Sequence, residues 1–175
     1  HGNEGPIPIR RIPESEWPPL TQALSQYAQT HQIPFIADMN GDFRDGFGAV
    51  PMCNTPSRRA STALCYLTDD VRRRSNFTLV NLCTVNRILF EGRRAVGVEA
   101  EVGNNTINFR SNEVILSGGG IFSPTLLMRS GIGNGQALQA HNISVVANRL
   151  GVGQNLQNHP IMFLAMHLKP KARQS

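Results

Sequence analysis

Apolar residues in the first third of the chain recur at the three- and four-residue spacing that is typical of amphipathic helices. Ser15 can cap a helix that runs to about His31, and a second helix is predicted over residues 57–67. Ahead of them, residues 5–11 alternate apolar and polar positions and contain two prolines, which predicts a short edge strand. Residues 35–56 lack periodicity, and a loop of this length often lines or covers a site. The apolar side chains of the first helix are expected to face inward: Trp17, Leu20, Leu24, Tyr27 and Ala28.

From about residue 76 the pattern changes from helical spacing to strands. Short runs rich in β-branched residues are separated by turn signals at Glu91–Gly92 and at Gly103–Asn105. Because the last three runs follow one another through short turns, they predict an antiparallel meander. The predicted strands are Phe77–Val80, Val85–Phe90, Ala95–Val102 and Thr106–Arg110.

A different kind of strand follows the meander. Glu113–Leu116 ends in a wholly apolar run, which is typical of a buried strand in a parallel sheet. Three glycines come next, and a short apolar helix is predicted over Thr125–Arg129, opened by Ser123-Pro124 and closed by Ser130-Gly131. Glycines between a strand and a helix let backbone approach a ligand closely, and a helix start offers free N–H groups. The candidate binding residues are Ser117, Gly118, Gly119 and Gly120.

The last part of the chain predicts smaller elements. A helix is expected over Gly135–His141 and a strand over Ile143–Val146, followed by a polar loop over Leu150–His159. The tail from Lys169 is basic and is expected to fray.

The composition is that of a globular protein with a sizeable core. The chain has 175 residues, a net charge of +5 and 40% hydrophobic residues. No apolar run is long enough to span a membrane, and no secretory signal pattern stands at the start, which leaves the location cytoplasmic or undecided. The three cysteines lack CxxC spacing and matching histidines, so we expect no metal site and mostly buried thiols.

The basic charge leaves a second interpretation open, a module that binds nucleic acid with salt-sensitive affinity. The densest basic run, Arg72–Arg74, has no interleaved aromatic residues and lies in a predicted loop. A solvated basic face explains such a run better, and we expect no nucleic acid partner.

The full sequence of the glycine segment is more specific than a strand, a glycine turn and a helix. Gly119–Gly133 resembles the second signature of the glucose–methanol–choline (GMC) family of FAD-dependent oxidoreductases, with Gly120 where the family usually has alanine. Gly151–Pro160 resembles another family motif, with Asn158 in place of an aspartate. Further matches run in order along the chain: Gly2–Ile7, Asp38–Gly41, Arg59–Leu67, Arg74–Phe77 and Ala95–Glu99.

The resemblance implies an α/β fold class, or α+β for a fragment. The expected architecture is part of a two-dinucleotide-type FAD-binding fold with an antiparallel meander, together with part of the substrate domain. Residues 1–56 would belong to the substrate domain and residues 57–160 to the FAD-binding domain. Residues 161–175 would begin another substrate-domain segment or form a frayed tail. The family's opening Gly-x-Gly-x-x-Gly turn and its closing catalytic histidine are not found, which indicates a central fragment.

The resemblance also implies a function for the parent protein. It would oxidise the CH–OH group of a small-molecule alcohol to a carbonyl and pass hydride to the flavin N5 of FAD. The main chain of Val85 would pair with the adenine, Ser117 and Gly118–Gly120 would lie against the cofactor, and Asn158 and His159 would lie near the site. No catalytic residue is expected here, and the remaining N- and C-terminal parts of the enzyme would be the partners. A cyanohydrin lyase of the same fold is the alternative.

Overall fold

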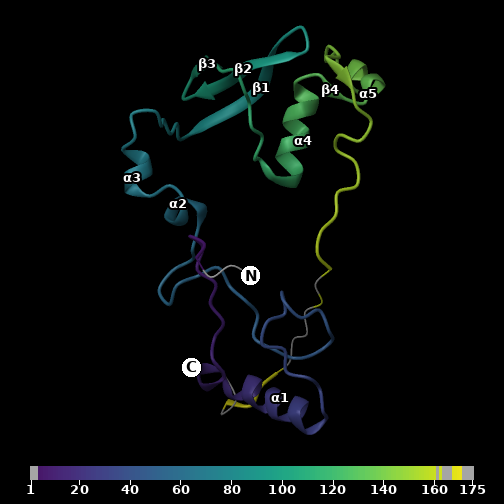
Figure 1. Cartoon of the computed structure of the whole chain (residues 1–175). Coiled ribbons are helices and arrows are strands. Elements are labelled where there is room, and N and C mark those ends of the chain that lie inside the picture. Colours follow the sequence, from purple (N-terminus) through teal and green to yellow (C-terminus); the bar gives the residue numbers. More distant parts are fainter. Residues whose placement is uncertain (1–3, 161, 163–166, 171–175) are drawn as a thin grey trace. The chain divides into compact units, whose positions relative to one another are not determined.

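The computed structural model describes residues 4–160, 162 and 167–170, and the chain divides into two compact units (Figure 1). The first unit comprises residues 1–79 with 163–175, and the second comprises residues 80–162. The mixed helix and strand composition with an antiparallel meander is confirmed.

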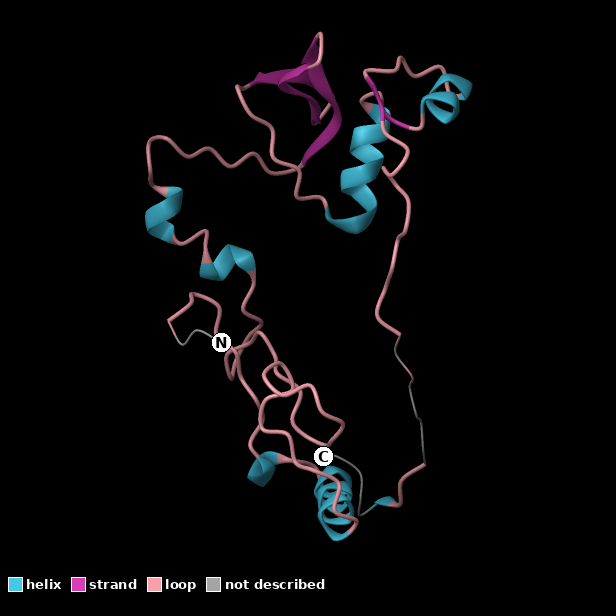
Figure 2. Ribbon diagram, turned by 45° about the vertical axis from the view of Figure 1, so that its right-hand side comes forward, coloured by secondary structure: helices cyan, strands magenta, loops and turns pink. Residues whose placement is uncertain are grey.

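The described part of the first unit is mostly loop, with short helices (Figure 2). The first predicted helix is confirmed but begins later than expected, at Pro19, because proline is favoured at the first helical position. The second helix, predicted over residues 57–67, is only four residues long. The expected strand over residues 5–11 is a single bridge between Arg10 and Met52. The helices are η1 (Glu14–Glu16), α1 (Pro19–Thr30), α2 (Thr62–Cys65) and α3 (Asp69–Arg72).

The small core of this unit forms around Trp17. The indole N–H of Trp17 donates to the carbonyl oxygen of Ile12 at 2.8 Å, and its ring meets Phe47 edge to face at 5.8 Å. Ile36 is buried beside them, and its backbone N–H donates to the carbonyl oxygen of Phe47. The expected inward face of α1 is partly wrong, since Leu24 and Tyr27 are exposed whereas Ala28 is buried.

The second unit is built on the meander, which the structure confirms with longer strands than predicted. Strands β1 (Cys83–Glu91), β2 (Arg94–Val102) and β3 (Asn105–Arg110) form an antiparallel sheet in the order β1-β2-β3. Ala100 and Ile88 are buried at its centre. Strand β1 is therefore an edge strand, and it departs from regular pairing between Val85 and Arg87.

Helix α4 (Gly119–Arg129) packs against β1, and it begins six residues before the predicted start. Helix α5 (Gly135–Ala140) confirms the next predicted helix, because the side chain of Asn134 caps it by accepting from two backbone N–H groups. The predicted strand over Ile143–Val146 is displaced: two-residue strands β4 (Ile132–Gly133) and β5 (Ala147–Asn148) pair in parallel instead.

Two predicted strands form no ladder within the described residues. Phe77–Val80 and Glu113–Leu116 carry no strand assignment, and 80% of the Ile115 side chain is exposed. Their apolar sequences suit a buried sheet, but a strand exists only where a neighbour supplies hydrogen bonds. These two expectations are therefore wrong for the chain as the structure describes it.

Three further features bear on the sequence analysis. No helix in the described ranges has the length and apolar character that crossing a bilayer requires. The described residues hold no group of His, Cys, Asp or Glu side chains that could bind a metal ion. The expectation of buried thiols is wrong, since Cys53 is exposed and the other two cysteines are half-buried.

Gly97 generates the first testable prediction, because β2 and β3 approach closely there. Its φ is +146°, and a Cβ atom would overlap the carbonyl oxygen of Phe109. Gly97→Ala should lower the free energy of unfolding by about 3 kcal/mol through strain and overlap. Gly92→Ala, at φ +60° with open space around it, should cost only about 1 kcal/mol. Urea denaturation measures both, and equal losses would contradict the close approach.

An ion pair across β1 and β2 generates the second prediction. Arg87 donates to both carboxylate oxygens of Glu99, at 3.0 and 2.7 Å. This hydrogen bonding holds the pKa of Glu99 below its ordinary value of 4.5. The resulting stabilisation is present above that ordinary value and is lost as the pH falls through the lowered pKa.

The wild-type protein should therefore be more stable than Glu99→Gln at neutral pH, and the difference should shrink in acid. Denaturant unfolding at a series of pH values measures it. Glu101→Gln is the matched control on the same strand, because Glu101 has no ion pair in the described part of the chain. A wild-type advantage that is constant with pH would contradict the role of the Glu99 carboxylate.

Candidate functional site

A cavity of about 440 Å³ opens between the edge of the meander and helix α4. One wall comes from β1 and β2, the second from the extended segment before α4, and the third from α4 itself. The cavity forms here because α4 packs on β1. The extended segment that connects the meander to α4 closes a third side. The lining includes Val85, Val98, Ser117, Gly118, Thr125 and Leu126.

The glycine bend, Gly118–Gly120, lies at the N-terminus of α4. Gly118 precedes the helix, and Gly119 takes a φ of +79°, which is a conformation that favours glycine. A Cβ at Gly119 would meet nothing within 4 Å, whereas a Cβ at Gly120 would make an ordinary contact with Leu156 at 3.6 Å. The main chain of the bend is thus open to approach by another molecule.

The start of α4 differs from the prediction for a reason that concerns Ser123 and Pro124. The hydroxyl of Ser123 does not cap a helix that begins there; it accepts from the backbone N–H of Gly118 at 3.0 Å. Pro124 lies inside the helix and has no N–H, so the carbonyl of Gly120 lacks the amide that would normally bond to it. No side chain caps the first turn of α4, so its backbone N–H groups remain available to a ligand.

Val85 is on the opposite wall, next to the irregularity in β1. Among the described residues β1 pairs with β2 alone, so alternate backbone groups of β1 face away from the sheet. Val85 thus lies on an edge strand and lines the cavity.

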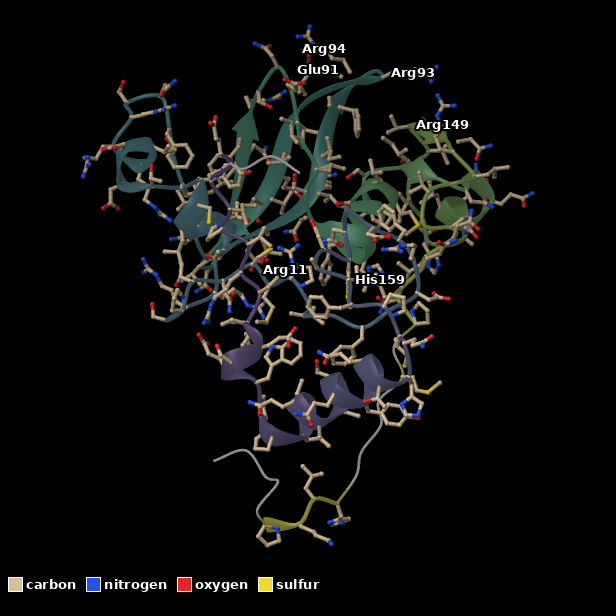
Figure 3. All side chains as sticks on the ribbon, turned by 60° about the horizontal axis from the view of Figure 1, so that its bottom comes forward. Arg11, Glu91, Arg93, Arg94, Arg149 and His159 are labelled. Atoms are coloured by element: carbon tan, nitrogen blue, oxygen red, sulfur yellow. The ribbon has the colours of Figure 1, made fainter. Side chains whose placement is uncertain are left out.

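The polar loop after β5 carries the other two candidate residues. Gly120 and Leu156 line a second cavity of about 630 Å³ between α4 and this loop. Asn158 and His159 lie beyond its lining and are exposed, and the backbone N–H of His159 donates to Asn158 Oδ1 at 2.8 Å. Figure 3 labels His159 among the side chains. The structure thus brings Val85, Ser117 and Gly118 to one cavity and leaves this pair apart from it.

The chemistry of the first cavity is mainly apolar. Its charged lining residue is Arg129, whose Nη2 donates to Asn86 Oδ1 at 3.4 Å. Walls of valine, leucine and threonine side chains suit a mainly apolar ligand group.

Ser130 lies beside this cavity and was predicted from the sequence only as the end of a helix. Its side chain is buried between α4 and β1. Its hydroxyl accepts from the backbone N–H of Ile88 at 2.8 Å and donates to the carbonyl oxygen of Leu126 at 2.6 Å. A serine at a helix end is common, so the sequence held no signal of this long-range contact.

Comparison with known proteins gives consistent matches. A family model described as GMC oxidoreductase matches residues 3–161. The chain is 42% identical over 168 residues to an oxygen-dependent choline dehydrogenase from Pseudomonas savastanoi pv. phaseolicola, covering 94% of this chain and 29% of that protein. An enzyme of the same name from Yersinia pestis is 40% identical over 173 residues, covering 97% of this chain and 30% of that protein.

Solved structures agree with these sequence matches. A pyridoxine 4-oxidase from Mesorbium loti matches with a TM-score of 0.76 and 28% identity, over 85% of this chain and 29% of that one. An FAD-dependent oxidoreductase from Chaetomium thermophilum matches with a TM-score of 0.72 and 26% identity, over 85% and 26% of the two chains. The chain thus spans less than a third of the length of these relatives.

Proposed function

The chain belongs to the GMC oxidoreductase family, and from this premise we propose that it forms the central part of an enzyme that uses FAD to oxidise a small-molecule alcohol. The observation that carries the proposal is the cavity between β1 and α4. It gathers Val85 with Ser117 and Gly118, which follow it by more than thirty residues, around one mainly apolar space.

The residues around this cavity fit the adenosine end of the cofactor. A flat adenine ring would lie between the aliphatic walls, with the main chain of Val85 hydrogen-bonding to its edge. The bend at Gly118–Gly120 would approach the neighbouring part of the cofactor, because no side chain at Gly119 or Gly120 stands in the way.

FAD, when bound, accepts the hydride that leaves the alcohol carbon. The role of these residues is to hold and orient one end of the cofactor so that its flavin reaches the substrate. The group that takes the hydroxyl proton would lie outside these residues, in the rest of the enzyme. Asn158 and His159 would lie near the site without acting as that group.

The domain assignment is part of the same proposal. Residues 1–56 would contribute to the substrate side and residues 57–160 to the FAD side; most of residues 161–175 lie outside the described part of the chain. The relatives named choline dehydrogenase make choline the first alcohol to test.

The full-length enzyme should purify yellow with a bound-flavin spectrum, and choline added without oxygen should bleach that spectrum. The 175-residue chain purified alone should carry no flavin, since it holds only part of the cofactor site. Full-length protein without FAD would overturn the proposal. Cyanohydrin cleavage without bleaching by any alcohol would point to a lyase.

A glycine of the bend and a glycine of the meander turn provide a matched test. Gly119→Ala must strain a positive φ in the bend and should weaken FAD binding by about tenfold, whereas Gly92→Ala strains a positive φ outside both cavity linings and should leave it unchanged. Fluorescence titration of the apoenzyme with FAD measures both dissociation constants. Equal affinities for the two variants would contradict a role of the bend in holding the cofactor.

A further inference from the structure

The buried hydroxyl of Ser130 joins the two elements that form opposite walls of the cavity. Ser130 is 8% exposed and Ile88 is 6% exposed, so water does not compete strongly for their hydrogen bond. The hydroxyl both accepts and donates. It accepts from the backbone N–H of Ile88 in β1 and donates to the carbonyl oxygen of Leu126 in α4. The last turn of α4 is therefore fastened to the outer edge of β1.

This fastening acts directly on residues that line the cavity. Leu126 is itself part of the lining, and Val98, which lies opposite Ile88 in the sheet register, lines it too. Val85 is three residues before Ile88 on β1, roughly 10 Å along the strand at the usual rise per residue. A shift of α4 at Ser130 would therefore change the separation of the walls on which a bound ring depends.

A second link at the same place is weaker. Arg129 Nη2 donates to Asn86 Oδ1 at 3.4 Å, where Arg129 is exposed and Asn86 is half-buried. Exposed contacts of this length are easily replaced by water, so they do not fix a separation. Among the side-chain hydrogen bonds between α4 and β1 in the described residues, only that of Ser130 is buried.

We propose that Ser130 is a positioning residue for the adenosine half of FAD. It touches no part of the cofactor and acts through Leu126, Val98 and Val85 by holding α4 at a fixed distance from β1. Without the hydroxyl, the Ile88 N–H loses its acceptor in a buried setting, and the two walls separate to admit water. This inference rests on the proposed FAD function, and it adds a residue that determines how well the adenosine end is held.

The test compares two cofactors that share the flavin but differ in the adenosine. In full-length apoenzyme, Ser130→Ala should raise the dissociation constant for FAD by about tenfold and leave that for FMN unchanged. Ser111→Ala is the matched control, because the Ser111 hydroxyl also donates to a backbone carbonyl, that of Glu113, but is not in the cavity lining. It should bind both cofactors as the wild type does.

Rescue by conservative variants separates positioning from a loss of stability. Ser130→Thr keeps the hydroxyl and should restore most of the FAD affinity. If Ser130→Ala does not fold, Ser130→Cys keeps a similar volume with only a weak hydrogen-bonding group, and its affinity for FAD should fall while that for FMN does not.

Three results would overturn the inference. FAD affinity unchanged in a Ser130→Ala protein that melts at a lower temperature would leave Ser130 a purely structural role. Equal losses for FAD and FMN would show a general disturbance. Wild-type enzyme that binds FMN and FAD equally would show that the adenosine is not held at this cavity, even if the proposed flavin chemistry holds. Wild-type enzyme that binds neither cofactor would instead refute the proposed function itself.

Discussion

Strand β1 is an edge strand, and its outward-facing backbone groups need partners that the meander cannot supply. Helix α4 covers that edge, and the buried bond from Ile88 to Ser130 satisfies one of these groups. The cavity, the position of the glycine bend and the place of Val85 in the cavity wall all depend on this packing. An edge strand that is only partly covered leaves room for a ligand to provide the remaining hydrogen bonds.

The meander and the glycine bend could be predicted because their signals are local. Turn residues such as Gly92 and Gly103 mark where the chain reverses, and the β-branched runs between them leave little choice of register. The bend was recognised because an apolar run, three glycines and an apolar helix follow one another. The order of motifs along the chain added the family, which periodicity alone could not provide.

The features that could not be predicted depend on tertiary contacts. Ser123-Pro124 has the composition of a helix start, yet α4 begins at Gly119, and the Ser123 hydroxyl accepts from the backbone N–H of Gly118. The helical spacing of apolar residues in α1 did not reveal which face is covered, since Ser25 is buried and Leu24 is exposed. Ser130 illustrates the same limit, since its partner lies 42 residues away in sequence.

The extended segment Glu113–Leu116 has a consequence for the handling of this polypeptide. Its backbone pairs with no strand in the described part of the chain, and Ile115 is 80% exposed while Val114 and Leu116 are half-buried, which leaves a short apolar edge. Such an edge can recruit an identical segment from a second molecule, which is how self-association and precipitation begin. The same apolar character that suits the segment to a sheet interior thus makes the isolated polypeptide prone to aggregate, and refolding at high concentration would favour that outcome.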